Sequence, residues 1–380
     1  MNDIVILAAK RTPIGTLNGA LAAYSAPQLG SKAIAAALAT AGVKPEAVGE
    51  VVMGNVLGAG IGQAPARQAM KAAGLPDSTG ATTVNKVCGS GMKAIMLACQ
   101  SLQLGETGIA VAGGMESMSR APYLLDKARS GYRLGHGQLL DAIIHDGLWD
   151  PYNDMHMGMC GELCAEKEGL SREAQDKYSV ESYERAQQAQ AAKAFEAEMA
   201  PVDGIAVDEE PGRARLDKIA KLRPAFKKEG TITAANASKL NDGAAALVLA
   251  AADMAGGATP LARIAGWATH SQAPEWFTTA PAGAIEKLLK KLGWTKESVD
   301  LYEVNEAFAV VALAVMKLTG IPREKVNVNG GAVALGHPIG ASGARIVATL
   351  VHALAARNLK RGVAAICLGG GEAVALAVER

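Results

Sequence analysis

Residues 83–94 read Thr-Val-Asn-Lys-Val-Cys-Gly-Ser-Gly-Met-Lys-Ala and join the end of a strand to the start of a helix. Residues 82–87 are typical of a strand end, and from residue 92 to 102 apolar residues recur at helical spacings of three and four. Cys88 is therefore expected at a helix N-terminus, where unpaired N–H groups and the helix dipole favour a thiolate. The same amides can hold an oxyanion beside the sulfur. A buried structural cysteine is the alternative interpretation.

The same stretch also fits a dinucleotide-binding fingerprint. Residues 89–94 match the pattern G-x-G-x-x-A, which would indicate a dehydrogenase. That fingerprint requires an acidic residue at the end of a second strand about 20 residues further on, and the chain has none at that spacing. The match is weak for this reason, and a titration with NAD would test it.

Composition restricts the class of protein. A chain of 380 residues is long enough for about two or three domains with a sizeable core. The formal net charge of +1, without a basic block, gives no reason to expect nucleic acid as a partner. Five scattered cysteines argue for a reducing compartment. We see no signal peptide and no run as long as a membrane span, so we expect a cytoplasmic α/β enzyme that does not bind membranes.

Apolar runs typical of buried strands alternate with helical patterns at both ends of the chain. The predicted strands are residues 4–9, 50–56, 109–112, 244–251, 261–268, 301–304 and 363–368, and the predicted helices are 26–41, 64–73, 282–292 and 344–356. This alternation indicates a mostly parallel sheet covered by helices. Residues 119–238 are more polar and contain one long helix, from residue 171 to about 199, so they predict an inserted lobe.

The two ends of the chain repeat three features about 250 residues apart, which indicates a duplicated α/β half. The features are a strand followed by asparagine, a glycine-rich turn that leads into a helix, and a strand that ends in glycines. The matched pairs are Asn55 and Asn305, Cys88 and His337, and Gly113 and Gly369. Duplication would bring equivalent strand ends together, and we expect Cys88, Asn305, His337 and Cys367 to lie near one another.

Four motifs resemble those of the thiolase family, and the resemblance covers essentially the whole chain. They are the nucleophile signature at 85–94, the Asn-Glu-Ala-Phe motif at 305–308, the histidine loop at 336–343 and the second-cysteine motif at 367–371. Glu372-Ala373 departs from the family, because many members have a small or flexible pair there. The resemblance is closest to the mitochondrial-type subgroup.

The resemblance implies an α/β thiolase fold, a duplicated five-layered αβαβα core with an inserted loop domain. The N-terminal half would comprise residues 1–118 and 239–257, the loop domain that binds CoA residues 119–238, and the C-terminal half residues 258–380. It also implies acetyl-CoA C-acetyltransferase activity, in which two acetyl-CoA reversibly give acetoacetyl-CoA and CoA. A homotetramer is implied as well.

The resemblance assigns a role to each candidate catalytic residue. Cys88 would attack the thioester and carry the acetyl group in a ping-pong reaction, and His337 would accept its proton. Cys367 would be the second acid and base, acting on the methyl group of the incoming acetyl-CoA. His337 and a water held by Asn305 would form one oxyanion hole. The N–H groups of Cys88 and Gly369 would form the other.

The family's CoA contacts map onto the inserted lobe. The corresponding residues are Tyr183, Arg213, Lys218, Ser238, His156 and Met157, with Phe277 as a wall of the acyl pocket that could tolerate a 2-methyl branch. Arg215 stands where the subgroup has an acidic residue. No cofactor is required beyond CoA as substrate and product. The subgroup also binds potassium, which would here use backbone oxygens of Ala234, Ala235, Ala237 and Val333.

Two further possibilities concern the histidine and the cysteines. His156, Cys160 and Cys164 have the spacing and the chemistry of zinc ligands, but no fourth ligand is evident. A condensing enzyme of the ketoacyl-synthase type would pair its cysteine with two histidines, whereas the second partner here is Cys367. A non-catalytic lipid-binding or scaffold member of the fold should lack one of the catalytic positions, and all are present. The sequence does not determine the direction of the reaction.

Overall fold

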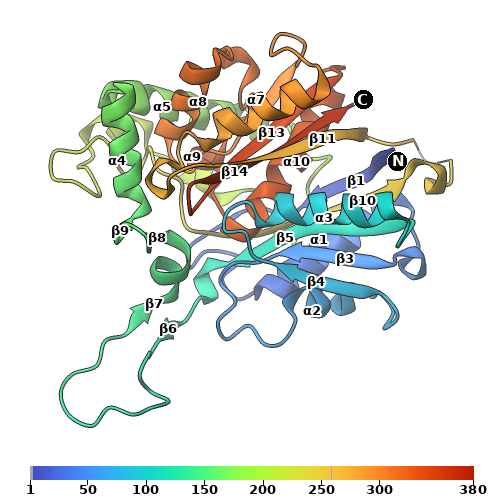
Figure 1. Ribbon diagram of the computed structural model, residues 1–380, viewed down its shortest axis with the longest axis horizontal. Coiled ribbons are helices and arrows are strands. Elements are labelled where there is room, and N and C mark those ends of the chain that lie inside the picture. The colour runs from blue at the N-terminus through green and yellow to red at the C-terminus, as the bar shows by residue number, and fades with distance from the viewer. Residues whose placement is uncertain (1–2, 258) are drawn as a thin grey trace.

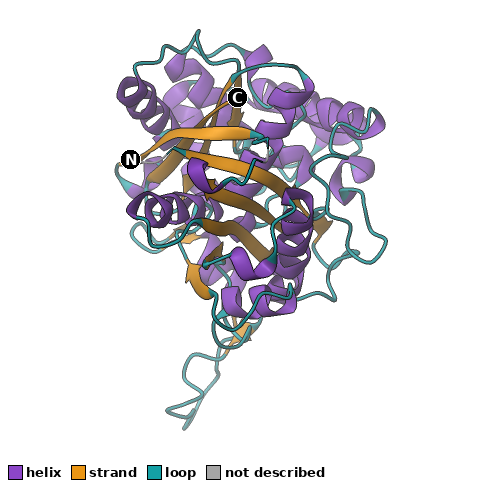
Figure 2. Ribbon diagram, turned by 90° about the vertical axis from the view of Figure 1, so that its right-hand side faces the viewer, coloured by secondary structure: helices purple, strands orange, loops and turns teal. Residues whose placement is uncertain are grey.

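The computed structural model describes residues 3–257 and 259–380, which form one large mixed sheet with helices on both of its faces (Figures 1 and 2). The strands of this sheet are β1 (Ile4–Arg11), β2 (Gly15–Thr16), β3 (Glu50–Gly54), β4 (Gly80–Val84), β5 (Ile109–Ser117), β10 (Asn241–Ala251), β11 (Ala262–Ser271), β12 (Leu301–Val304), β13 (Arg361–Leu368) and β14 (Glu372–Glu379). The helices are α1 (Ala26–Ala41), α2 (Pro65–Ala72), α3 (Ser90–Leu104), α4 (Met157–Glu168), α5 (Arg172–Ala191), α6 (Glu209–Arg213), α7 (Ala280–Leu292), α8 (Ala309–Thr319), α9 (Ala332–Leu335) and α10 (Ile339–Ala356).

The strand order confirms the predicted duplication. The order is β12-β13-β14-β11-β1-β10-β5-β3-β4, so β11-β14-β13-β12 repeats β1-β10-β5-β3 outward from the centre. The central strands β1 and β11 pair through Val5 with Arg263 and Ile6 with Ala262. The parallel pair of β3 with β5 corresponds to that of β12 with β13. β4 extends the N-terminal half alone.

Three hydrophobic clusters divide the structure into layers. Side chains of α3 and α10 pack together with strands of both halves, from Ile6 and Leu247 to Ile366 and Leu376. Helices α1 and α2 cover the outer face of the N-terminal half, and α7 covers that of the C-terminal half. Because α3 and α10 contact strands of both halves, these two helices form a central layer between the two halves of the sheet. With the outer helices, the helices and strands alternate in five layers, as expected. Among the described residues, α10 alone is long and apolar enough to cross a membrane, and 83% of it is buried inside the structure.

The sheet differs from the mostly parallel one that the sequence indicates. β3 with β4, β3 with β5 and β12 with β13 are parallel, whereas β1, β10, β11 and β14 all pair antiparallel with their neighbours. The prediction missed β14, which returns directly along β13. Gly370 and Gly371 have φ values of 88° and 81° and make this tight turn possible. A direct return of this kind makes the two strands antiparallel.

The inserted lobe is anchored to the sheet by a buried ion-pair cluster. Arg11, at the end of β1, donates two hydrogen bonds to Asp208 at 2.7 and 2.9 Å and another to Glu198. Asp208 also accepts from the backbone of Ile14 at 2.8 Å. Helix α5 ends at Ala191 rather than near residue 199. The chain turns back immediately after it and brings Glu198 and Asp208 to β1.

Candidate active site

Cys88 lies directly before α3, as predicted. The turn is fixed by two local hydrogen bonds, from Lys86 N to Ser90 Oγ at 2.8 Å and from Val87 N to Asn85 Oδ1 at 3.0 Å. Val87 has a φ of 45°, a left-handed conformation that is costly for a β-branched residue. Strain of this kind persists where the surrounding structure imposes it, and here it is next to the candidate nucleophile.

Cys88 is a protonated thiol at rest. Burial against apolar side chains and the nearby charge of Glu116 raise its pKa to about 12, although part of the residue remains exposed. The backbone N–H groups of Cys88 and Gly369 donate to the sulfur and oppose this rise. The expectation that the helix N-terminus favours a resting thiolate was therefore wrong, because the cost of burying the charge is larger. Cys88 needs a base to become a nucleophile.

His337 is a neutral imidazole with one nitrogen free. Burial lowers its pKa to about 3, with a smaller effect from Arg345. Nδ1 lies 2.6 Å from Ser342 Oγ, and that hydroxyl donates to Pro338 O at 2.9 Å. Ser342 must then accept from Nδ1–H, which leaves the lone pair on Nε2. Among the described residues Nε2 has no hydrogen-bond partner, so it is able to accept a proton.

Neighbouring strands bring Asn305 and Cys367 to the same edge of the sheet. Asn305 follows β12, and its N–H donates to Ala365 on β13 at 2.9 Å. Its side chain is buried, yet neither amide atom has a partner among the residues that the structure describes. Cys367 is fully buried on β13. Burial is the main cause that raises its pKa well above the ordinary value, and the nearby Cys88 thiol is the second cause. The two cysteines are thus close enough to influence each other.

Glu116 is a buried carboxylate that the sequence did not single out. It accepts from Val56 N at 3.0 Å, Leu57 N at 3.2 Å and Gly340 N at 2.9 Å, and from the side chain of Asn55 at 2.8 Å. Burial raises its pKa to about 7 against these hydrogen bonds. Because Gly340 belongs to the histidine loop, Glu116 fixes that loop to the N-terminal half. The only signal in the sequence was an acidic residue four positions after the predicted buried strand 109–112.

Glu306 has the equivalent function in the C-terminal half. It accepts from Tyr178 at 2.7 Å and Ser182 at 2.8 Å, which both lie on α5, and from Val333 N at 3.1 Å. Asn327 donates a fourth bond at 2.8 Å. The carboxylate therefore connects the lobe to α9, which directly precedes the histidine loop.

An ion pair spans the two cysteine loops. Lys86, two residues before Cys88, contacts the carboxylate of Glu372, the first residue of β14. Glu372 is the residue at which the chain departs from the family motif. The departure therefore adds a charged contact between the loop that carries Cys88 and the turn that follows Cys367.

A cavity of about 540 Å³ opens between the lobe and the core, and His337 lies in its wall. Three of the residues predicted to bind CoA line it, namely His156, Arg213 and Ser238. Four others do not. Tyr183 is buried on α5, Lys218 is exposed on the short helix 216–221, and Met157 and Phe277 pack in the apolar cluster that contains Cys367.

Two family descriptions match the chain, "Thiolase, N-terminal domain" over residues 4–253 and "Thiolase, C-terminal domain" over residues 258–380. The chain belongs to the thiolase family. An Arabidopsis thaliana protein named acetyl-CoA acetyltransferase 2 is 55% identical to this thiolase, over 99% of this chain and 97% of its own. A Chromobacterium violaceum acetyl-CoA acetyltransferase is 51% identical over the full length of both. A solved Ascaris suum thiolase in complex with coenzyme A has a TM-score of 0.96 and 45% identity, and the match covers both chains completely.

The glycines of the dinucleotide-like pattern have a packing function in this thiolase. A Cβ atom on Gly89 would lie 2.5 Å from Leu368, and one on Gly91 would lie 2.8 Å from the backbone of Ala344. Gly91 therefore requires glycine, because a backbone lies against it, and at both positions another part of the protein rather than a pyrophosphate occupies the space.

Two of the four residues predicted to bind potassium already have a cation as a partner. The carbonyl oxygens of Ala237 and Val333 accept from Lys239 Nζ at 2.7 and 3.3 Å, so an ammonium group already lies where potassium was expected. Ala235 is buried and Ala234 is exposed. In the zinc candidate, Nδ1 of His156 accepts from Gly158 N at 3.0 Å, and its ring stacks on Phe226. Residues 3–257 and 259–380 contain no metal-like group of three His, Cys, Asp or Glu side chains.

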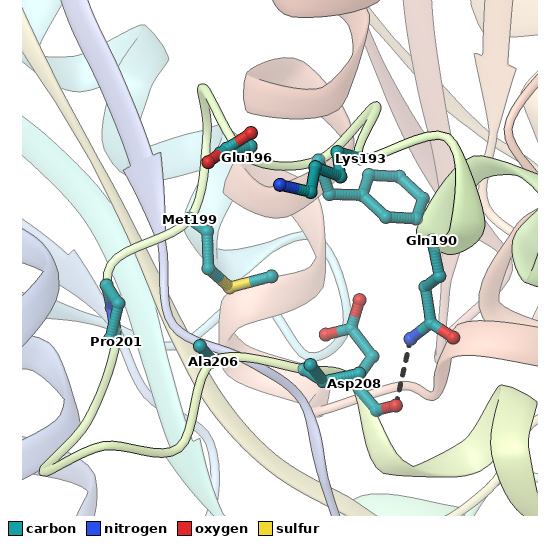
Figure 3. Close-up of a pocket in the computed structure, with 9 residues that line it drawn as sticks. Gln190, Lys193, Glu196, Met199, Pro201, Ala206 and Asp208 are labelled. Carbon is teal, nitrogen blue, oxygen red and sulfur yellow. Dashed lines mark hydrogen bonds between the residues drawn. The ribbon is translucent and has the colours of Figure 1, made fainter.

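A second cavity, of about 300 Å³, lies in the lobe and is lined by Phe195, Met199 and Asp208 (Figure 3). Gln190 donates to the backbone oxygen of Asp208 at 2.9 Å, and both carboxylate oxygens of Asp208 accept from Arg11. The acidic group of this cavity is thus used to anchor the lobe, and the candidate catalytic residues lie elsewhere.

The raised pKa of Cys88 predicts how the thiol reacts with iodoacetamide. Only the thiolate reacts, so the alkylation rate should rise about tenfold per pH unit from pH 7 to 9 without levelling. The alkylation rate of an ordinary thiol levels off above its pKa of about 8.5. The measurement is the rate of adduct formation by intact mass, with Cys88→Ala to identify the site. A plateau below pH 9 would show that Cys88 is a resting thiolate or an unperturbed thiol.

Proposed function

We propose that this thiolase is an acetyl-CoA C-acetyltransferase, which condenses two acetyl-CoA to acetoacetyl-CoA and CoA and runs reversibly. The observation that carries the proposal is the pair of interacting thiols, Cys88 and Cys367, beside a neutral histidine. The acetyl-CoA acetyltransferases among its relatives and the CoA complex of the Ascaris suum thiolase support the choice of substrate.

In the first half-reaction, Nε2 of His337 takes the proton of Cys88, and the sulfur attacks the acetyl thioester. The N–H groups of Cys88 and Gly369 stabilise the oxyanion that develops. CoA leaves as a thiolate and takes the proton of Cys367. The products are acetyl-Cys88, free CoA, a Cys367 thiolate and a protonated His337. The resting charges support this starting state, because both thiols are protonated and the imidazole is neutral.

In the second half-reaction, the Cys367 thiolate removes a proton from the methyl group of another acetyl-CoA. The enolate oxygen accepts a hydrogen bond from protonated His337 and another from a water held by Asn305. The enolate carbon attacks the acetyl group, and Cys88 leaves as a thiolate that regains its proton from His337. All three groups return to their starting states. The unpartnered amide of Asn305 supports the position of that water.

CoA itself would occupy the large cavity beside His337. Arg213 in its wall suits a phosphate of the nucleotide, and Lys218 is exposed on the segment that follows. Phe277 belongs to the apolar cluster around Cys367, so it would shape the space for the acyl group. A rigid ring at this place would leave room for a 2-methyl branch.

The test separates the two half-reactions. Cys367→Ser should still form acetyl-Cys88 from acetyl-CoA. The rate of condensation should fall by about 100-fold or more, because the variant loses the base that removes the methyl proton of the second acetyl-CoA. Intact mass measures the first step and a coupled assay the second, with Cys99→Ala as a matched control for a buried cysteine outside the site. An acetyl adduct that persists in Cys88→Ala, or faster cleavage of longer 3-ketoacyl-CoAs than of acetoacetyl-CoA, would contradict the proposal.

We also propose that the protein assembles as a homotetramer through an extended arm. Between β6 (Tyr123–Leu124) and β7 (Leu140–Asp141) the chain runs far out from the body of the molecule (Figure 1). The arm exposes large apolar side chains, with Tyr123 at 64%, Leu134 at 100% and Leu139 at 65%. An exposed apolar group of this kind is typical of a protein contact, and a second copy of the chain supplies a matching arm.

Replacing the apolar end of the arm should reduce the size of the assembly. We expect Leu134→Ser with Leu139→Ser to give dimers where the wild type gives tetramers in light scattering, because the contact loses its apolar surface. Leu104→Ser is the control, since Leu104 is 76% exposed at the end of α3, outside the arm. A tetrameric double variant would show that the arm is not the contact.

We further propose that the protein acts in the cytoplasm. All of its cysteines are free thiols, which suits a reducing compartment. Cell fractionation that recovers the protein in a secreted or organellar fraction would contradict this.

A further inference from the structure

Lys239 follows Ser238 in the wall of the large cavity, and its ammonium group connects three segments. Nζ donates to Ala237 O at 2.7 Å and to Val333 O at 3.3 Å, and it lies 5.6 Å from the centre of the Tyr183 ring. Ala237 lies near the end of the inserted lobe, Val333 belongs to α9 and Tyr183 lies on α5. One cation therefore joins the lobe to the segment that precedes His337.

The partners of this ammonium are dipoles rather than carboxylates. Within the described part of the chain Lys239 forms no ion pair within 4.0 Å, and the nearest acidic influences are Glu210 and Glu306. Burial lowers the pKa of Lys239 to about 8, and these two carboxylates oppose the change. Backbone carbonyls with an aromatic face are ligands that suit a monovalent cation.

We infer that the Lys239 ammonium is the built-in cation of this site, takes the place of a free potassium ion, and positions the histidine loop through Val333. Val333 is held on both sides, because its C=O accepts from Lys239 and its N–H donates to Glu306. Helix α9 ends at Leu335, immediately before Gly336 and His337. A shift of Val333 would therefore move the general base, so Lys239 is a positioning residue rather than a catalytic one.

The inference predicts chemical rescue by potassium. Thermal unfolding and kcat/KM are measured in KCl, NaCl and choline chloride at equal ionic strength. Wild type should show the same Tm and the same kcat/KM in all three salts, because its cation is covalently attached. Lys239→Ala opens the space, so in NaCl its Tm should be lower and its kcat/KM should fall by about tenfold. KCl should restore most of both losses, since potassium is close in size to an ammonium group.

Two further variants make the result specific. Lys239→Met fills the space without a charge and should stay impaired in every salt. Lys291→Ala is the matched control. The Lys291 ammonium donates to the carbonyl of Trp267 at 3.2 Å and lies 5.5 Å from the centre of the Trp267 ring, so it has the same kinds of partner as Lys239, but on the exposed surface. It should show no response to potassium.

A wild-type Tm that rises specifically in KCl would overturn the inference, because a free potassium ion would then bind alongside Lys239. Equal Tm values of Lys239→Ala in KCl and NaCl would also overturn it, because the carbonyl oxygens would then not form a cation site. The wild-type measurement stands even if a variant fails to fold, and the Tm readout does not depend on which acyl-CoA is the substrate.

Discussion

The active-site geometry depends on the close contact between the backbones of α3 and α10. A Cβ atom on Gly91 would lie 2.8 Å from the backbone N of Ala344, and one on Gly343 would lie 2.5 Å from that of Met92. The contact is reciprocal, as expected for equivalent positions of a duplicated unit. Because Cys88 directly precedes one helix and His337 precedes the other, this contact sets the distance between nucleophile and base. No side chain larger than glycine fits there without moving the helices apart.

Burial determines the charge states at the end of these helices. It holds Cys88 and Cys367 as thiols and His337 as a neutral base, and at Cys88 it does so against the helix dipole and against the N–H groups that donate to the sulfur. Each of the three groups must gain or lose a proton before it can act. In the proposed reaction these protons pass between the three groups and the substrates. The buried carboxylates Glu116 and Glu306 accept hydrogen bonds from the backbone on both sides of His337, at Gly340 and Val333. The same low-dielectric interior that suppresses ionisation therefore also fixes the geometry.

The sequence predicted most strands and helices because their apolar patterns are long and local, as in α1, which spans the predicted residues 26–41. It also predicted that the ends of the equivalent strands meet. It missed β14 and the antiparallel pairing, since pairing direction depends on connections and not on composition. It could not predict the thiol state of Cys88, because the dipole is visible in the motif whereas the depth of burial is not. Lys239 was overlooked because a lysine in a polar stretch is typically solvated, and only the fold brings Val333 to it.

The most direct test of this account is the rate of acetyl transfer from acetyl-CoA to Cys88 in Gly343→Ala. The added methyl group pushes α10 away from α3, and a displacement near 1 Å can cost about 100-fold in rate. Gly80→Ala is the control, because a Cβ atom there meets only Gly49 O at an ordinary 3.6 Å. We predict about a 100-fold slower transfer in Gly343→Ala while circular dichroism shows a folded protein. A folded Gly343→Ala protein that acetylates Cys88 at the wild-type rate would contradict the central claim.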